Sequence, residues 1–414
     1  MHKRVAVVIA SVLLGALLPP PVHAQTTTLT LADAISRAQQ SAPALAAAEA
    51  ALRAADANVD VAALAPNPTL SYQAENVMGT GRYADFGSSE RTLAVSVPIE
   101  LGGKREARRR VAEAERGATR LGLNATRADI TQRVTVAFIA VAAAEQRLSV
   151  MRDGHELAGQ AARAAHQRVA VGKASPIEEE RARVLLVNAD VKLGKAERAL
   201  NLALTDLGRY TGARAPYLVA ATWFESLVTA RDNKEVVTLP AAAAAEARLA
   251  AASARVDAAR RDRIPDLTLI AGSRRFGDSP DRAAVLGISI PLPLFNRGSQ
   301  ALARSHADYE RVQAERGAAM QEVEQALSHA QVDVADALAA AEAARGPALA
   351  AAEEAARIAR LGYSAGKFPQ LELIEAERAL TETREAAIDA LAAFHTAQAH
   401  LAYLRGSIAP LYKD

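Results

Sequence analysis

The chain has 414 residues, half of them hydrophobic and only 4% aromatic, with 49 lysines and arginines against 47 aspartates and glutamates. This near-neutral balance argues against a nucleic-acid-binding protein, which would carry a basic surplus, and the lack of cysteine excludes disulfides, thiol catalysis and thiolate metal sites. Alanine is abundant and large side chains are scarce, so the composition favours long, thin helical layers over a deep globular core.

The first residues have the pattern of a secretory signal peptide. Lys3 and Arg4 precede an apolar run from Val5 to Leu18, which has a typical signal-peptide length and is too short to cross a bilayer as a helix. Val22 and Ala24 supply the small residues that signal peptidase reads, which places the predicted cleavage before Gln25. We therefore predict that residues 1–24 are a signal peptide and that the protein is secreted from the cytoplasm; an N-terminal anchor helix is the alternative.

The remainder of the chain repeats itself at an offset of about 193 residues. The matching segments are Ser96–Lys104 with Ser289–Arg297, Val171–Lys173 with Ala365–Lys367, and Leu207–Gly212 with Leu401–Gly406. A common offset at three places predicts an internal duplication. We therefore divide the chain into a first repeat (25–212), a middle insert (213–240), a second repeat (241–406) and a C-terminal tail (407–414).

Each half begins with a helix and then has two segments in which polar and apolar residues alternate, as in β-strands. These segments are Pro68–Val77 and Arg91–Leu101 in the first half, and Pro265–Ser273 and Ala284–Leu292 in the second. Alternation over about ten residues fits both a half-buried strand and a tilted transmembrane strand. The connecting loops, Met78–Glu90 and Arg274–Arg282, are polar and predicted to be solvated. A soluble four-stranded sheet packed on helices remains an alternative to a membrane sheet.

Very long helices are predicted after each strand pair. Apolar or small residues recur there at alternating steps of three and four, which indicates coiled-coil packing. The segment from Lys104 to Val171 would form a helix roughly 100 Å long, more than an ordinary globular domain spans. Asp153-Gly154 and Gly346-Pro347 are the predicted weak points, and we expect a kink there because proline removes a backbone hydrogen bond.

Four strands are too few to close a barrel. An open sheet edge in a membrane leaves unpaired backbone groups that cost several kcal/mol each, and single-chain barrels have at least about eight strands. If the predicted strands lie in a membrane, the chain must combine them with those of further copies.

The residues around the first strand pair carry a family resemblance. Pro66–Leu70 with Glu75-Asn76, followed by Pro98–Arg105, resembles the TolC-like outer-membrane factors, most closely the branch that serves cobalt–zinc–cadmium or copper–silver efflux. The resemblance covers the whole chain after the predicted signal. It implies a mainly α fold with a small β part and a two-fold internal repeat: long antiparallel helical hairpins form a coiled-coil tunnel, and four antiparallel transmembrane strands per chain join a barrel completed by trimerisation.

The same resemblance implies the function and the partners. A homotrimer in the lipid of a Gram-negative outer membrane would be a passive export duct. Its periplasmic end would dock a membrane-fusion adaptor and, directly or through that adaptor, an inner-membrane RND transporter. The insert and the tail would form an equatorial band. Many members carry a lipidated N-terminal cysteine, which this chain lacks, so we expect anchoring by the barrel alone. The substrate stays open between heavy-metal cations and drugs.

Two helix–turn–helix tips are the adaptor-docking sites that the resemblance implies. The predicted docking residues are Arg168, Gly172, Lys173 and Ser175 on the first tip, and Arg360, Tyr363, Gly366 and Lys367 on the second. Gly366 is expected to adopt a positive φ angle. Ser175 is expected to cap the following helix, with Pro176 in its first turn.

A pore gate is predicted just after the second tip. Glu372 and Glu375 stand where the family carries two acids around the closed pore entrance, and their spacing places them on one helix face. In a trimer they would form two stacked carboxylate rings that favour cations. A solvated helix face is the alternative.

No catalytic or metal-binding pattern stands out. The chain has no HExxH, CxxC, GxSxG or P-loop motif, so we predict no enzyme activity, no cofactor and no metal site. Six histidines are expected on the surface or at helix seams: His155, His166, His306, His329, His395 and His400. A periplasmic coiled-coil scaffold or adhesin-like stalk without a pore is the alternative to the duct.

Overall fold

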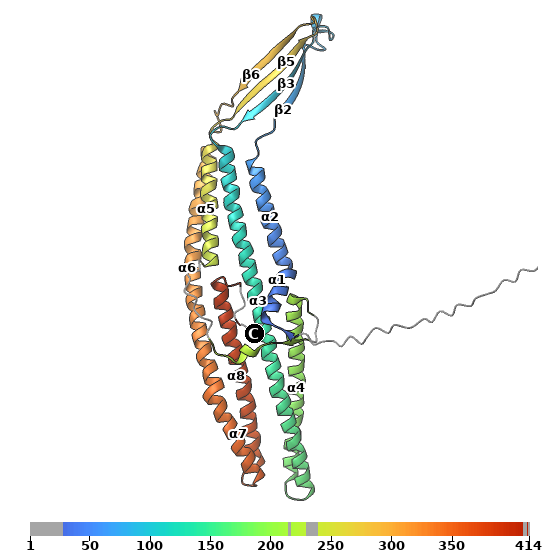
Figure 1. Cartoon of the computed structure of the whole chain (residues 1–414), viewed down its shortest axis with the longest axis vertical. Helices are drawn as coiled ribbons and strands as arrows, with labels where there is room; N and C mark the ends of the chain where they lie inside the picture. The colour runs from blue at the N-terminus through green and yellow to red at the C-terminus, as the bar shows by residue number, and fades with distance from the viewer. Residues whose placement is uncertain (1–27, 214–216, 229–238, 409–411, 413–414) are drawn as a thin grey trace, which may run out of the picture.

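The computed structural model describes residues 28–213, 217–228, 239–408 and 412, so the predicted signal peptide and its cleavage site lie outside the described residues. A long bundle of helices forms most of the molecule, and a small sheet extends from one end of it (Figure 1). The sheet projects beyond the helices, which is contrary to the alternative of a sheet packed on helices (Figure 1).

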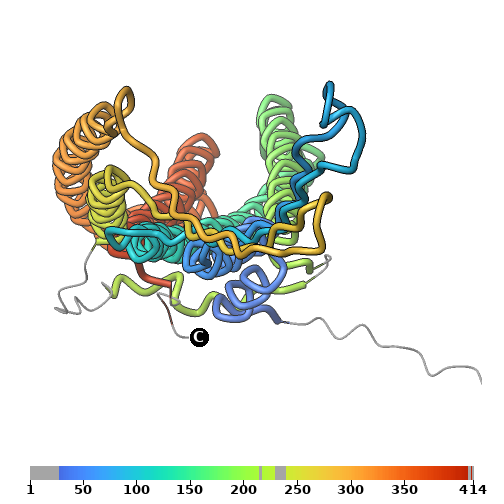
Figure 2. Tube along the Cα trace, turned by 90° about the horizontal axis from the view of Figure 1, so that it is seen from above, coloured from blue at the N-terminus to red at the C-terminus, as the bar shows by residue number. Residues whose placement is uncertain are grey.

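The described residues form eight α-helices. These are α1 (Leu31–Ser41), α2 (Pro43–Ala63), α3 (Lys104–Ala170), α4 (Pro176–Thr211), α5 (Pro240–Arg261), α6 (Ser299–Ala343), α7 (Leu349–Ser364) and α8 (Gln370–Leu404). Figure 2, a view from above, shows the long helices arranged as an open arc, with α1 and the segment around 217–228 on its convex side.

The two predicted weak points behave differently. Helix α3 runs for 67 residues and continues through Asp153 and Gly154, so no break occurs there; a glycine keeps its N–H and costs a helix only about 1 kcal/mol. At Gly346-Pro347 a π-helical turn, η3 (Ala344–Ala348), separates α6 from α7. Proline cannot donate the next helical hydrogen bond, and a π turn is one way to accommodate that loss.

The strands form one antiparallel sheet in the order β2-β3-β5-β6. They are β2 (Thr69–Glu75), β3 (Glu90–Ile99), β5 (Leu267–Phe276) and β6 (Arg282–Ser289). The two halves of the chain meet where β3 pairs with β5, with Ile99 opposite Leu267.

The strand boundaries differ from the prediction by one to three residues, and the two largest differences have a visible cause. Strand β5 extends to Phe276, three residues beyond the expected end, because Arg274 pairs with residues of the neighbouring strands instead of joining the loop. Strand β6 ends at Ser289 instead of Leu292, because Pro291 and Pro293 lack the N–H that a ladder requires.

The largest buried cluster lies at mid-height of the helices, where α1, α3, α4 and α8 meet. It includes the fully buried side chains of Leu31, Val134, Phe138, Leu207 and Phe394. The middle insert enters this cluster: β4 (Leu218–Val219) pairs in parallel with β1 (Thr28–Leu29), and the 3-10 turn η2 (Thr222–Glu225) buries Trp223 and Phe224. Residues 217–228 of the insert lie around the middle of the bundle (Figure 1), and Tyr412 stacks on Trp223 there.

Helix α3 is apolar enough in one window to resemble a membrane span. An 18-residue window reaches a mean hydropathy of 1.4, although 56% of that window is buried within the chain. A core helix gives the same signal, and α3 contributes Val134, Phe138 and Val141 to the buried cluster.

Candidate functional site

The two hairpin tips end the bundle on the side opposite to the sheet (Figure 1). In the first, Gly172 has a φ of 70°, and the N–H of Lys173 donates to the Arg168 carbonyl at 2.8 Å. In the second, Gly366 has a φ of 68°, and the N–H of Lys367 donates to the Gly362 carbonyl at 2.8 Å. Both are glycine-terminated helix ends of the Schellman type, and Gly366 has the positive φ that the sequence predicted.

Side-chain contacts join the two tips. The guanidinium of Arg168, at the end of α3, lies 5.1 Å from the ring centroid of Tyr363, at the end of α7, a distance typical of a cation–π contact. Arg360 forms an ion pair with Glu377 of α8, with 2.8 Å between Nη2 and Oε2. The Arg168–Tyr363 contact joins the two tips, whereas the Arg360–Glu377 pair fastens the second hairpin to itself.

The remaining predicted docking residues are solvent-exposed at the turns: Gly172, Lys173, Ser175, Gly366 and Lys367. Ser175 occupies the N-cap position of α4 before Pro176, but its side chain makes no cap hydrogen bond, so that part of the prediction is wrong. The N–H of Glu178 donates instead to the Ser175 carbonyl at 2.9 Å. The Ser175 hydroxyl thus stays available at the surface.

Glu372 and Glu375 lie in the first two turns of α8, and both are exposed. Among the described residues neither takes part in an ion pair, whereas Glu377 of the same helix is paired with Arg360. Two carboxylates therefore stand unpaired on the chain surface beside the second tip, where they are available to cations or to other copies.

The histidines do not gather. His155 lies 3.7 Å from Asp190 and His166 lies 2.9 Å from Glu179, both across the seam between α3 and α4. His400 contacts Gln132, while His306 and His329 are exposed. His395 is the exception to the surface prediction, because it is fully buried. In the part of the chain that the structure describes, no group of three or more metal-ligating side chains is found.

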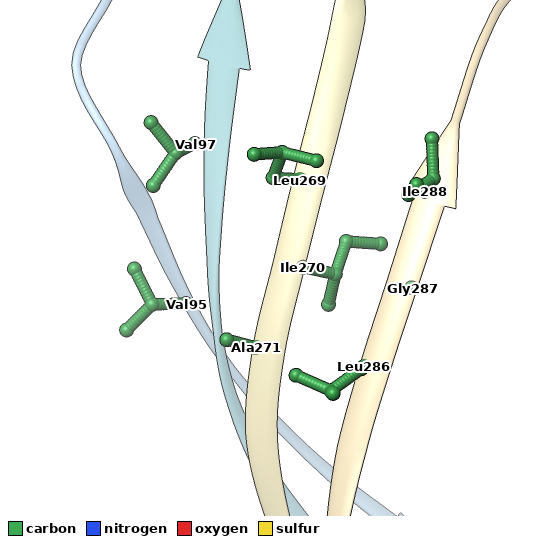
Figure 3. Close-up of a pocket in the computed structure, with 8 residues that line it drawn as sticks. All are labelled: Val95, Val97, Leu269, Ile270, Ala271, Leu286, Gly287 and Ile288. Atoms are coloured by element: carbon green, nitrogen blue, oxygen red, sulfur yellow. The ribbon is translucent and has the colours of Figure 1, made fainter.

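One face of the sheet is apolar and exposed. The alternation predicted this face, and the register aligns its residues across the strands: Tyr72 lies opposite Leu93, Val97 opposite Leu269, and Leu269 opposite Ile288. Figure 3 shows Val95, Val97, Leu269, Leu286 and Ile288 lining a shallow hollow on this face. Leu286 is 82% exposed and Leu70 is 68% exposed, so the described chain leaves a large apolar surface uncovered.

The opposite face of the sheet carries polar side chains over β2 and β3, together with Arg274 of β5. Arg274 forms ion pairs with Glu75 at 3.1 Å and with Glu90 at 2.7 Å, and its Nε donates to the Thr92 hydroxyl at 3.0 Å. Sequence reasoning missed this network because it placed Arg274 and Glu90 in loops. The signal that could have revealed it is that Arg274 continues the polar–apolar alternation of its strand beyond Ser273.

Comparisons with known proteins agree with this geometry. The family model described as outer membrane efflux protein matches residues 34–213 and 238–407. The cobalt-zinc-cadmium resistance protein CzcC of Cupriavidus metallidurans is 31% identical over 361 residues, which cover 86% of this chain and 85% of that protein. The nickel and cobalt resistance protein CnrC of the same organism is 30% identical over 66% of this chain and 65% of its own length. The outer membrane protein VceC from Vibrio cholerae superposes with a TM-score of 0.74 at 21% identity, covering 91% of this chain and 96% of that chain.

Proposed function

The chain belongs to the outer membrane efflux protein family, and from this premise we propose that it is the outer-membrane export duct of a tripartite RND-type efflux pump. The observation that carries the proposal is the sheet at the end of the helical bundle. Its exposed apolar face suits lipid, and its polar face suits a water-filled lumen. The helices below it are long enough to reach far into the periplasm.

We propose that the barrel and tunnel are completed by a homotrimer. The edge strands β2 and β6 each have a neighbour on one side only within the described sheet. Because the strands alternate in direction, β6 of one copy could pair antiparallel with β2 of the next. Three copies would supply twelve strands. Helix α4 also leaves an apolar stripe exposed, formed by Ile177, Val184, Val187 and Val191 at helical spacing, which suits packing on a neighbouring copy.

Heavy-metal cations are the proposed substrates, since CzcC and CnrC are named for resistance to cobalt, zinc, cadmium and nickel. Selection would belong to the inner-membrane transporter, because a duct does not need to bind its cargo tightly. The adaptor would dock at the two tips, where Lys173 and Lys367 are exposed.

A deletion strain tests this function. We expect increased sensitivity to zinc, cobalt, cadmium, nickel or copper, restored by the gene on a plasmid, with the protein found in the outer-membrane fraction as a heat-modifiable band. Sensitivity to antibiotics alone would favour drug efflux. Recovery in the soluble periplasmic fraction without any change in sensitivity would contradict the duct and favour a coiled-coil scaffold.

The pore gate is a separate part of the proposal. Replacing both Glu372 and Glu375 by alanine removes the carboxylates that would ring the periplasmic entrance, so we expect higher single-channel conductance and lower cation selectivity in planar bilayers. The matched control replaces Glu354 and Glu382, two exposed carboxylates of the same hairpin that pair with arginines on their own helices. Equal conductance in wild type and the gate variant would refute the assignment.

A further inference from the structure

Two joints connect the sheet to the helices, and they are built differently. The first lies between β3 and α3 and packs on the linker that precedes β5. The Nζ of Lys104 lies 2.8 Å from the carboxylate of Asp266, and the same carboxylate accepts the N–H of Leu101 at 3.1 Å. Arg261 donates to the Gly102 carbonyl at 2.9 Å. This joint is ionic and lies entirely within one chain.

Side-chain size is matched at the first joint. A Cβ atom added to Gly102 would lie 2.4 Å from Cδ1 of Ile264, so Ile264 fills the space that a larger residue would need. The side chain of Glu100 is only 7% exposed and is held by Arg105 and Arg108.

The second joint, residues 290–298 between β6 and α6, has no such partner. Leu292 is 76% exposed, Leu294 is 66% exposed and Phe295 is 100% exposed. Its contacts with the rest of the described chain include one hydrogen bond, from Arg263 to the Arg297 carbonyl at 3.3 Å. The linker 64–68 before β2 is also exposed throughout. Two apolar, proline-rich segments thus lie uncovered at the two edges of the sheet.

The strand register shows which segments are equivalent. Thr69 pairs with Ser96 in the first half, and Thr268 pairs with Ser289 in the second. The linker Ala65-Pro66-Asn67 before β2 therefore corresponds to Ile264-Pro265-Asp266 before β5, and the joint after β6 corresponds to the joint after β3. Within the chain, the first joint meets the linker before β5 because β3 pairs with β5.

We infer that segment 290–298 of one copy seats on the linker 64–68 of a second copy, forming an apolar joint in place of the ionic one. The inference rests on the proposed function, since it requires β6 of one copy to lie beside β2 of the next. That arrangement brings the end of β6 to the start of the neighbouring β2, as the end of β3 meets the start of β5.

The residues at the second joint differ from their equivalents at the first joint in both size and charge. At the 193-residue offset of the duplication Phe295 stands for Gly102, and by the strand register Ala65 stands for Ile264, so the large and small partners are exchanged. The two acids of the first joint are both absent from the second, with Pro293 for Glu100 and Asn67 for Asp266, whereas Lys104 is matched by Arg297. The second joint also has more chain, because its left-handed glycine is Gly298, two residues later than the equivalent of Gly103. The extra length allows Phe295 to reach across to another copy.

Because the chain contains no cysteine, introduced thiols test this joint directly. The variant Ala65→Cys/Phe295→Cys is treated in outer-membrane vesicles with a short thiol-specific cross-linker. We expect dimer and trimer bands on denaturing gels, because links that join copies head to tail build a ladder. Each single variant should stay monomeric, and coexpression of the two single variants should give dimers.

A matched control places both thiols within one chain. Leu70 and Val95 are register partners on adjacent strands, so Leu70→Cys/Val95→Cys should form an internal link and no ladder. If wild type is oligomeric by amine cross-linking but the 65/295 variant gives no ladder, the joint is wrong and the proposed duct stands. If wild type is not oligomeric at all, the proposed function fails as well.

Lipid is the alternative occupant of Phe295, and it predicts a different result. A fluorophore attached to Phe295→Cys would be quenched by brominated lipids in vesicles if the position faced the bilayer, which would overturn the inference.

Exchanging the large and small side chains of the joint gives a second test. Phe295→Gly should lower the temperature at which the oligomer dissociates. Adding Ala65→Ile, which rebuilds the glycine–isoleucine pair of the first joint, should raise that temperature again. If it does not, Phe295 and Ala65 are not partners in the joint.

Discussion

His395 links three separate parts of the chain at the middle of the bundle. Its Nε2–H donates to the Phe224 carbonyl at 2.8 Å, and its Nδ1 lies 2.7 Å from the hydroxyl of Tyr412. The Tyr412 ring stacks on Trp223 with 4.0 Å between the ring centroids. Burial lowers the pKa of His395 and raises the pKa of Tyr412. A neutral imidazole therefore ties helix α8 to the insert and to the end of the chain.

This burial predicts a pH-dependent stability. Below about pH 6.5 the unfolded chain binds a proton at this histidine while the folded chain does not, so the free energy of unfolding falls as the pH drops, by up to about 1.4 kcal/mol per pH unit. Above that pH the contribution is constant. In thermal melts of the detergent-solubilised protein, His395→Gln should flatten the loss of stability below about pH 6.5. His306→Gln, at an exposed site, should retain it; the same pH profile in both variants would contradict this role.

The sequence could not predict the role of His395, because its partners are distant in the chain. Phe224 lies 171 residues away, and the helical pattern alone gives only the face of a helix. By contrast, the tip glycines were predictable, since Val-Gly-Lys and Ala-Gly-Lys follow long helical runs and glycine favours the left-handed helix end.

At the scale of the element, each tip turn requires one residue with a positive φ angle. Gly366 has a positive φ, and an added Cβ would meet nothing within 4 Å, so backbone strain is the only penalty for a side chain. Gly366→Ala should therefore lower the opening free energy of the tip by about 1–2 kcal/mol. Hydrogen exchange of the Lys367 amide, which donates to the Gly362 carbonyl, measures this change.

The matched control is a glycine within a helix. Gly317 lies in α6, is exposed, and also has open space around an added Cβ. Gly317→Ala should raise local protection by about 1 kcal/mol, because alanine has the higher helix propensity. The two variants should therefore change protection in opposite directions. Unchanged or higher protection of the Lys367 amide in Gly366→Ala would mean that the strain argument is wrong.

Local sequence patterns predicted which segments form helices and strands better than they predicted where those elements end. Three-four spacing identified the long helices because each carries a continuous apolar stripe. The end of β5 depends instead on Arg274, which bonds to Glu75 and Glu90 from two other strands, and no local pattern contains that contact. The π turn at Pro347 likewise was not predicted, because the sequence shows that proline lacks an N–H but not which hydrogen-bond pattern the helix adopts around it.

At the scale of the whole molecule, the exposed surfaces are the basis for proposing that the chain works as an oligomer. The apolar sheet face, the open edges of β2 and β6, and the α4 stripe are all uncovered in a single copy. Such exposure is unfavourable in water, and it is relieved if lipid covers the sheet face while other copies cover the rest. The duplication predicted from the sequence is consistent with this proposal, because segments equivalent to a joint made within the chain lie exposed at the two sheet edges.

Leu286 tests whether lipid covers the sheet face. It is 82% exposed and lies opposite Ala271 on the apolar face. Leu286→Arg should cost about 2–4 kcal/mol if the position is near the bilayer midplane, so we expect less protein in the outer-membrane fraction and a weaker heat-modifiable band. The control is Ser71→Arg, on the polar face opposite Ala94, where a lumen would hydrate the charge. Equal assembly of both variants would argue against a lipid-facing sheet, since only a bilayer distinguishes the two faces so strongly.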